Sequence, residues 1–205
     1  AGRIPVLIVL GNDDGGLQAN YHGTTIVAQM LRGMWSPWLA QMERAKMIMV
    51  RSVRPNDQCD LVATLERYDC PPYNAAGFLH EIVMMNYGGR LLKPSFLKKA
   101  YAECRKRDIP TCADEIQSCL WSPGFFMFRE YGLRPDLVAI GKGFPGGEYP
   151  ASRLLLNARL DCLAQFGALV TNGQEELAAL AYLITMQWAE KNIAVTRAVG
   201  DYYEA

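Results

Sequence analysis

The chain alternates between short continuous apolar runs and longer segments in which apolar positions recur every three to four residues. The apolar runs lie at 3–10, 47–50, 77–85, 109–113 and 136–140. Runs of this length, bounded by glycine, proline or polar clusters, are typical of strands buried on both faces of a parallel sheet. We therefore predict a strand in each of these runs, and a further strand at 153–156.

The periodic segments predict helices. The clearest is 96–107, where apolar residues form one stripe, basic residues occupy the other face, and Pro94 and Ser95 supply a helix start. A second long helix is predicted at 175–191, ending at Asn192. Weaker patterns predict helices at 26–34, 61–67, 125–132, 161–166 and from 195 onward.

One segment interrupts this pattern. Residues 35–38, with Pro37 between two tryptophans, interrupt the helical periodicity, so we predict a break there. Strands that alternate with helices in this way predict an α/β fold. The strand at 77–85, the helix at 96–107 and the strand at 109–113 make one strand–helix–strand unit.

Asp114 and Lys142 each follow one of the predicted strands, and they stand 28 positions apart. That separation suits one crossover between parallel strands, and it is too long for a hairpin. Ligands of open α/β sheets bind at the carboxyl ends of the strands, so the acid and the lysine are expected in one crevice. A desolvated lysine there could form a Schiff base with an aldehyde, as pyridoxal phosphate requires, while an acid faces the ring nitrogen. A surface lysine beside a glycine turn remains the alternative.

Composition excludes several classes of protein. The 205 residues carry 21 basic and 21 acidic side chains, a formal net charge of zero, which argues against nucleic acid or an anionic membrane as partner. No apolar run reaches the length of a membrane-spanning helix. The six cysteines lack CxxC spacing, so we expect no metal site and reduced thiols in a cytoplasmic protein.

Several motifs occur together and in order. Asp114-Glu115-Ile116-Gln117 is similar to D-E-V/I-Q, and 128–136 (FREYGLRPD) is similar to F-x-x-Y/H-G-x-x-P-D. The segment 141–150 (GKGFPGGEYP) is similar to K-G-L/I-G-G-G-Y-P. In this combination the chain resembles the class III aminotransferases (ornithine, acetylornithine and omega-amino acid type), over nearly its whole length. These are pyridoxal phosphate enzymes of fold type I.

The resemblance implies roles for three residues of the central stretch. Lys142 would hold the cofactor as an internal aldimine and move a proton as general base and acid. Asp114 would keep the ring nitrogen protonated. Gln117 would hydrogen-bond near the phenolic oxygen of the ring.

It also implies cofactor-binding roles for residues elsewhere. Tyr21 would cover one ring face, with His22 beside it. Glu81 would lie in a strand that leads to the active site, although Ile82 stands where the family has proline. Thr171 would bind the phosphate from the neighbouring subunit; the alternative is that Thr171 or Asn172 caps the following helix.

The resemblance further implies a three-layer α/β/α fold with a mostly parallel central sheet, apparently truncated. We expect 1–191 to be part of the cofactor-binding large domain and 192–205 to begin a linker to a small domain. The expected enzyme is a homodimer that takes an amino acid or amine as donor and a 2-oxo acid as acceptor. Asn86 occupies the place of a glutamate that pairs with the substrate-carboxylate arginine in many members, so their substrate preference is not carried over.

Three alternatives stay open. The chain could be a non-catalytic, dimerising module. Alternatively, its parts could serve another pyridoxal phosphate reaction, such as that of a racemase, a mutase or a decarboxylase. The segment 141–147 could be read as a nucleotide loop, but it lacks the spacing and ending of a P-loop. His80, beside Glu81, is interpreted as a hydrogen-bonded core residue rather than a base.

Overall fold

The computed structural model describes residues 2–11, 31, 35–85, 88–120, 122, 124–146, 151–164, 167 and 175–204. The chain divides into two compact units, 1–114 and 115–205. The predicted boundary at 191 between a large domain and a linker stays a prediction.

A parallel sheet forms the centre of the first unit. It contains β1 (Ile4–Leu10), β2 (Met49–Val53), β3 (Tyr73–Glu81) and β6 (Thr111–Asp114), in the order β2-β1-β3-β6. Each neighbouring pair in this order is parallel. All four strands were predicted, although β3 begins before the expected run and ends at Glu81. A short antiparallel ribbon, β4 (Val83–Met84) with β5 (Arg90–Leu91), comes after β3.

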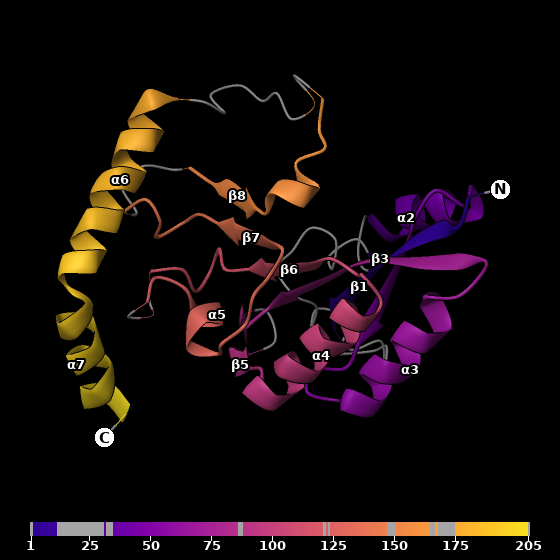
Figure 1. Ribbon diagram of the computed structural model, residues 1–205, viewed down its shortest axis with the longest axis horizontal. Helices are drawn as coiled ribbons and strands as arrows, with labels where there is room; N and C mark the ends of the chain where they lie inside the picture. Colours follow the sequence, from indigo (N-terminus) through magenta and orange to yellow (C-terminus); the bar gives the residue numbers. More distant parts are fainter. Residues whose placement is uncertain are drawn as a thin grey trace. The chain divides into compact units, whose positions relative to one another are not determined.

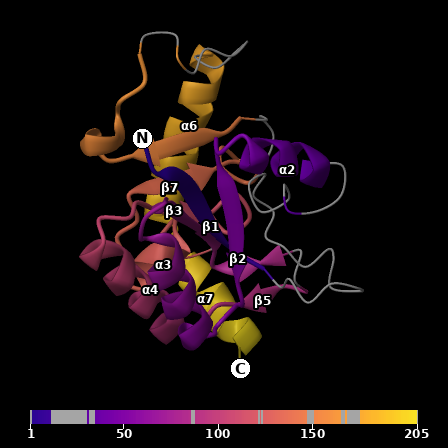
Figure 2. The same cartoon turned by 90° about the vertical axis from the view of Figure 1, so that its right-hand side faces the viewer.

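Helices cover both faces of this sheet. Helix α2 (Ser36–Arg44) lies on one side of the strands, and α3 (Gln58–Tyr68) and α4 (Pro94–Lys106) lie on the other (Figures 1 and 2). Leu39 of α2 packs in one buried cluster with Val9 and Val50 of the sheet. The first unit therefore has the predicted three-layer α/β/α arrangement with a parallel sheet, which confirms the expected fold class.

The predicted break at 35–38 falls where α2 begins, so residues 36–38 form the first turn of a helix, while 32–34 lie outside the described residues. Pro37 lies in the first turn of the helix, where its missing N–H would have no partner within the helix and its fixed φ suits the helix. Helix α3 begins after Asp57, whose side chain accepts a hydrogen bond from the backbone N–H of Asp60 at 2.9 Å. The expected helix at 61–67 is confirmed and is longer than predicted.

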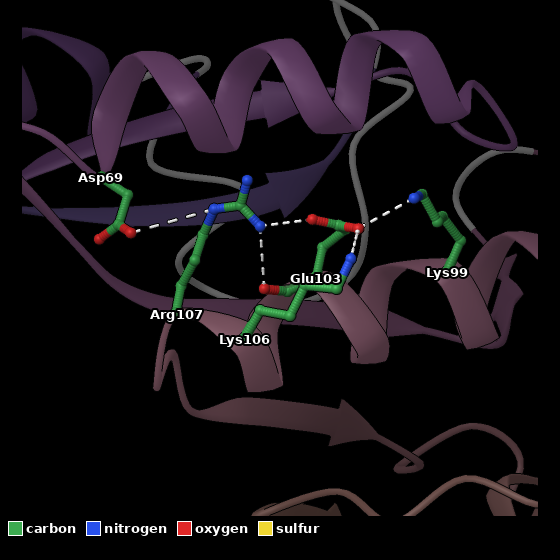
Figure 3. A network of polar contacts seen from close by, with 5 residues as sticks. All are labelled: Asp69, Lys99, Glu103, Lys106 and Arg107. Atoms are coloured by element: carbon green, nitrogen blue, oxygen red, sulfur yellow. Dashed lines mark hydrogen bonds and ion pairs between the residues drawn. The ribbon is translucent and has the colours of Figure 1, made fainter.

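A cluster of charges fastens α4 and links its end to the end of α3 (Figure 3). The buried carboxylate of Glu103 accepts hydrogen bonds from Lys106 at 2.8 Å, from Lys99 at 2.9 Å and from Arg107. The Arg107 guanidinium also lies 4.0 Å from the Asp69 carboxylate, at the end of α3. The hydrogen bonds from Lys106, Lys99 and Arg107 hold the pKa of Glu103 well below its ordinary value of 4.5.

The second unit contains an antiparallel strand pair and several helices. Strands β7 (Leu137–Ile140) and β8 (Arg153–Leu156) pair antiparallel. The helices are α5 (Met127–Glu130), α6 (Glu176–Lys191) and α7 (Ile193–Glu204), with a 3₁₀ turn at Ala158–Leu160.

The second unit corrects two predictions. Residues 161–164, expected to be helical, are not, and Leu163 is exposed, so burial does not support the apolar pattern there. Glu175 occupies the N-cap position of α6, so neither Thr171 nor Asn172 is its N-cap residue. Asn192 ends α6 as predicted.

An aromatic cluster forms the core of the second unit. Phe125, Phe126, Phe144 and Tyr182 pack with Cys119, Val138 and Ile140. The Phe144 and Tyr182 ring centroids are 5.1 Å apart, which joins α6 to the loop after β7. This loop carries Lys142, so packing against α6 positions its backbone.

Two further findings limit the possible sites. Among the helices in the described ranges, none is long and apolar enough to cross a membrane. Within the same ranges, no group of three or more histidine, cysteine, aspartate or glutamate side chains is placed to hold a metal ion.

Candidate functional site

Two acidic residues stand at the ends of neighbouring strands of the first unit. Glu81 is the last residue of β3 and Asp114 the last of β6, and the two are register partners in the parallel ladder. Their exposed fractions are 2% and 6%. Both therefore lie at the carboxyl ends of strands, where open α/β sheets bind ligands.

His80 holds the end of β3 from within the core. Its Nδ1 lies 3.1 Å from the Glu81 carbonyl oxygen, and its Nε2 lies 2.9 Å from the Tyr101 hydroxyl of α4. Burial lowers the pKa of His80 to about 4, so the ring is neutral near pH 7. A carbonyl only accepts, so Nδ1 carries the proton and Nε2 accepts from the phenol. The prediction of a hydrogen-bonded core histidine is confirmed.

Lys142 lies in a tight turn of the second unit. The Phe144 N–H donates to the Gly141 carbonyl at 3.0 Å, and Lys142 between them has a φ of +51°. This left-handed conformation is costly for a residue with a Cβ. The lysine side chain is exposed, not desolvated as the pattern suggested. A strained turn thus presents a primary amine to solvent directly after β7.

Close packing on either side fixes the turn. A Cβ on Gly141 would lie 3.3 Å from the Ser152 Cβ, a tight contact, so a larger residue there would require the start of β8 to shift slightly. The Cys119 thiol donates to the Gly141 carbonyl at 3.3 Å. Burial raises the pKa of Cys119, which makes it a structural thiol rather than a nucleophile. Gln117, two residues before this cysteine, is half-buried in a turn.

Glu115 is a residue whose role sequence reasoning missed. Its carboxylate is fully buried and accepts hydrogen bonds from the Ser118 hydroxyl at 2.8 Å and from the N–H groups of Met127 and Phe128 at 3.1 and 2.7 Å. These are the first N–H groups of α5, so Glu115 caps that helix. The available signal was an acid inside an otherwise buried stretch, which requires partners.

Other predicted residues lie outside the described part of the chain. They are Tyr21, His22 and Thr171, together with Asn86. Asp114 belongs to the first unit, whereas Lys142 and Gln117 belong to the second. The expectation that all of them serve one crevice therefore stays a prediction.

Comparison with known proteins places these residues in a family. An acetylornithine aminotransferase of Aquifex aeolicus is 29% identical over 135 residues, which cover 63% of this chain and 35% of that protein. An ornithine aminotransferase of Plasmodium chabaudi chabaudi is 34% identical over 99 residues, covering 48% of this chain and 23% of that protein. The chain thus spans well under half the length of these relatives.

A solved structure shares the fold. The ornithine aminotransferase from Toxoplasma gondii, crystallised in the presence of oxidised glutathione and described as having partial occupancy of PLP at its active site, superposes with a TM-score of 0.66. The superposition covers 95% of this chain and 42% of that one, at 21% identity. The family model "Aminotransferase class-III" matches residues 17–199. This match includes both strand-end acids and the Lys142 turn, and the chain belongs to the class III aminotransferases.

Proposed function

We propose that this chain supplies the catalytic part of a pyridoxal phosphate-dependent aminotransferase. Such an enzyme transfers an amino group from an amino acid or amine to a 2-oxo acid. The observation that carries the proposal is the buried carboxyl of Asp114 at the carboxyl end of β6, in register with Glu81. Family membership and the Lys142 turn support it.

The chemistry of the donor groups fits this cofactor. A buried carboxyl pair at neighbouring strand ends favours a cation, and a protonated pyridine nitrogen is one. An amine held at an exposed turn is accessible to an aldehyde. When bound, the cofactor supplies a ring that accepts electrons as a bond to the substrate Cα breaks.

Each residue has a distinct role in the proposal. Asp114 accepts the N–H of the pyridine ring and keeps that nitrogen protonated. Lys142 would hold the aldehyde through its amine and, once displaced by the substrate amine, would carry a proton between the substrate Cα and the cofactor C4′. Gln117 donates to the phenolic oxygen. Glu81 adds negative charge beside Asp114.

The remaining assignments rest on resemblance. Tyr21 and His22 are proposed to lie against the ring, and Thr171 is proposed to bind the phosphate across a homodimer interface. A cytoplasmic location agrees with six cysteines that are thiols rather than disulfides. The relatives are named ornithine or acetylornithine aminotransferases, so ornithine and acetylornithine are the first donors to try.

The test is covalent attachment at Lys142. The purified protein is mixed with pyridoxal phosphate, scanned for a visible band before and after borohydride, digested and analysed by mass spectrometry. We expect a reducible band and an adduct on the peptide that contains Lys142. Lys142→Ala should abolish both, whereas Lys191→Ala, a change at another exposed lysine of the same unit, should not. An adduct spread equally over several lysines, or one unchanged in Lys142→Ala, would overturn the proposal.

A further inference from the structure

The end of β3 is held by a side chain of its own strand. The Glu81–Asp114 pair is the last register pair between β3 and β6, so the sheet ladder no longer constrains the chain beyond it. The carbonyl of Glu81 accepts instead from the imidazole of His80. The next carbonyl, that of Ile82, accepts the N–H of Leu92 at 2.9 Å. The His80 imidazole thus holds the Glu81 carbonyl at the point where β3 leaves the sheet.

The residue type at position 82 affects how the backbone of Glu81 is restrained. A proline at that position would confine Glu81 to extended backbone angles by steric contact. Ile82 stands there and imposes no such limit. A hydrogen bond to the Glu81 carbonyl restricts the rotation of the same peptide group. His80 therefore supplies by hydrogen bonding a restraint that the sequence does not supply sterically.

The imidazole is itself fixed from the opposite side. Tyr101, in the buried stripe of α4, lies 2.9 Å from Nε2 through its hydroxyl, and the His80 ring stacks on Phe78 with centroids 5.4 Å apart. The single proton of the neutral ring is needed at Nδ1, so the phenol must donate to Nε2. Helix α4 thereby sets both the tautomer and the orientation of the group that holds Glu81.

We propose that His80 is a positioning residue of the cofactor site: its Nδ1–H, oriented by Tyr101, fixes the end of β3 and so holds the Glu81 carboxyl beside Asp114 for a cationic ring nitrogen. This inference rests on the proposed function. It differs from a packing role, which any apolar side chain of similar volume would fill.

Two substitutions separate the two roles. His80→Asn places an amide N–H where Nδ1–H was and keeps the bond to the Glu81 carbonyl, whereas His80→Leu fills the space and loses the bond. Tyr101→Phe is added to both variants, so that neither retains a buried phenol facing an altered partner. Leucine nearly matches histidine in volume and asparagine is smaller, so a packing role alone would make the His80→Asn pair the more perturbed of the two.

The first readout needs no cofactor. Hydrogen exchange is measured on the segment 78–84 of the cofactor-free protein. Loss of one buried hydrogen bond, worth about 1.4 kcal/mol, should speed local exchange about tenfold in the His80→Leu pair and about threefold or less in the His80→Asn pair. Equal exchange in the two pairs would overturn the inference, whether or not the protein binds cofactor.

The second readout is the dissociation constant of pyridoxal phosphate, measured by fluorescence titration. We expect it to rise about tenfold in the His80→Leu pair and to stay within about threefold of the parent in the His80→Asn pair. Equal affinities in both pairs would also overturn the positioning role. If the unmodified protein binds no pyridoxal phosphate, the proposed function fails, and the exchange measurement still decides whether His80 holds Glu81.

Discussion

Glu81 and Asp114 are register partners at the ends of two adjacent parallel strands, so two carboxyl groups are buried at the same edge of one sheet. Buried acids of like charge disfavour each other's ionised form unless a cation or donor groups offset them. A ligand that brings a positive N–H to this edge therefore gains more than it would from one acid. In the proposed site, the pair would favour a cationic ligand over a neutral ligand of the same shape.

Removing the charge of Asp114 should weaken cofactor binding. Asp114→Asn exchanges a charge-assisted hydrogen bond for a neutral one, a loss of about 1.5–3 kcal/mol, so the dissociation constant of pyridoxal phosphate should rise about tenfold to a hundredfold. Asp108→Asn, at an exposed aspartate before β6, is the control and should bind as the parent does. Equal affinity of Asp114→Asn and the parent would remove Asp114 from the cofactor site.

Two substitutions of Lys142 should differ in their effect on stability but not in their effect on adduct formation. Its φ of +51° costs about 1 kcal/mol for a residue with a Cβ, and glycine avoids that cost. Lys142→Gly should therefore raise the free energy of unfolding by about 1 kcal/mol over Lys142→Ala, as measured by urea titration. Both variants should lose the borohydride-reducible adduct. Equal stability of the two variants would show that the turn is unstrained.

Glu115 should prove to be a structural acid. Glu115→Gln turns one buried acceptor into a donor that faces backbone N–H groups, which should lower the free energy of unfolding by about 2 kcal/mol. Ser118→Ala removes one hydroxyl donor and should cost about 1 kcal/mol. Urea unfolding measures both. A loss in Glu115→Gln no larger than that in Ser118→Ala would contradict the capping role.

The buried histidine predicts a dependence of stability on pH. The pKa of His80 is about 4 in the folded chain and about 6.5 when unfolded, so between these values the unfolded chain binds the extra proton. The free energy of unfolding should therefore fall by about 3 kcal/mol as pH drops from 6.5 to 4. His80→Asn should lack this component in urea titrations at each pH, while the remaining carboxyl groups titrate alike in both proteins. Parallel pH profiles would show that His80 is not held neutral.

The charge cluster on α4 should respond to acid in a similar direction. Because the folded pKa of Glu103 lies below its ordinary value of 4.5, its contribution is complete above that pH and is lost as pH falls through the lowered value. Glu103→Gln should lower the urea midpoint at pH 7 more than Lys99→Met, which removes one of three cationic partners. The gap between Glu103→Gln and the parent should narrow in acid. A difference in urea midpoint that widens in acid would contradict a stabilising role of the ionised Glu103 carboxylate.

Strong local signals made much of the fold predictable. The strands β1 and β7 are apolar runs, β6 lies largely within the predicted run 109–113, and α4 combines an apolar stripe with a start signal. The start of α2 was not predictable in the same way, because Pro37 suits both a break and a first helical turn. Packing of Leu39 against the sheet decides between them, and that contact is tertiary.

The candidate site likewise has features that local sequence predicts and features that depend on tertiary contacts. Asp114 and Lys142 follow predicted apolar runs, so the places of Asp114 at the end of β6 and of Lys142 shortly after β7 were predictable from the sequence. Glu81 was expected inside the run 77–85, so the end of β3 at this residue was not predicted. The role of Glu115 depends on the backbone of 127–128, which the fold brings to it across a dozen residues. The exposure of Lys142 likewise depends on the turn at Gly141, which no periodicity encodes.

The apolar surface of α6 bears on how this chain behaves in a test tube. Ala178, Tyr182 and Thr185 form its buried stripe, while large apolar side chains elsewhere on the helix are exposed, namely Leu177, Leu180, Leu183, Ile184, Met186 and Trp188. Such a surface adsorbs dyes, detergents and other copies of the chain without any specific geometry. In a concentrated sample, light scattering or a shifted elution volume would thus reflect nonspecific association as well as any defined subunit stoichiometry. Cofactor titrations are best performed dilute, with a trace of non-ionic detergent.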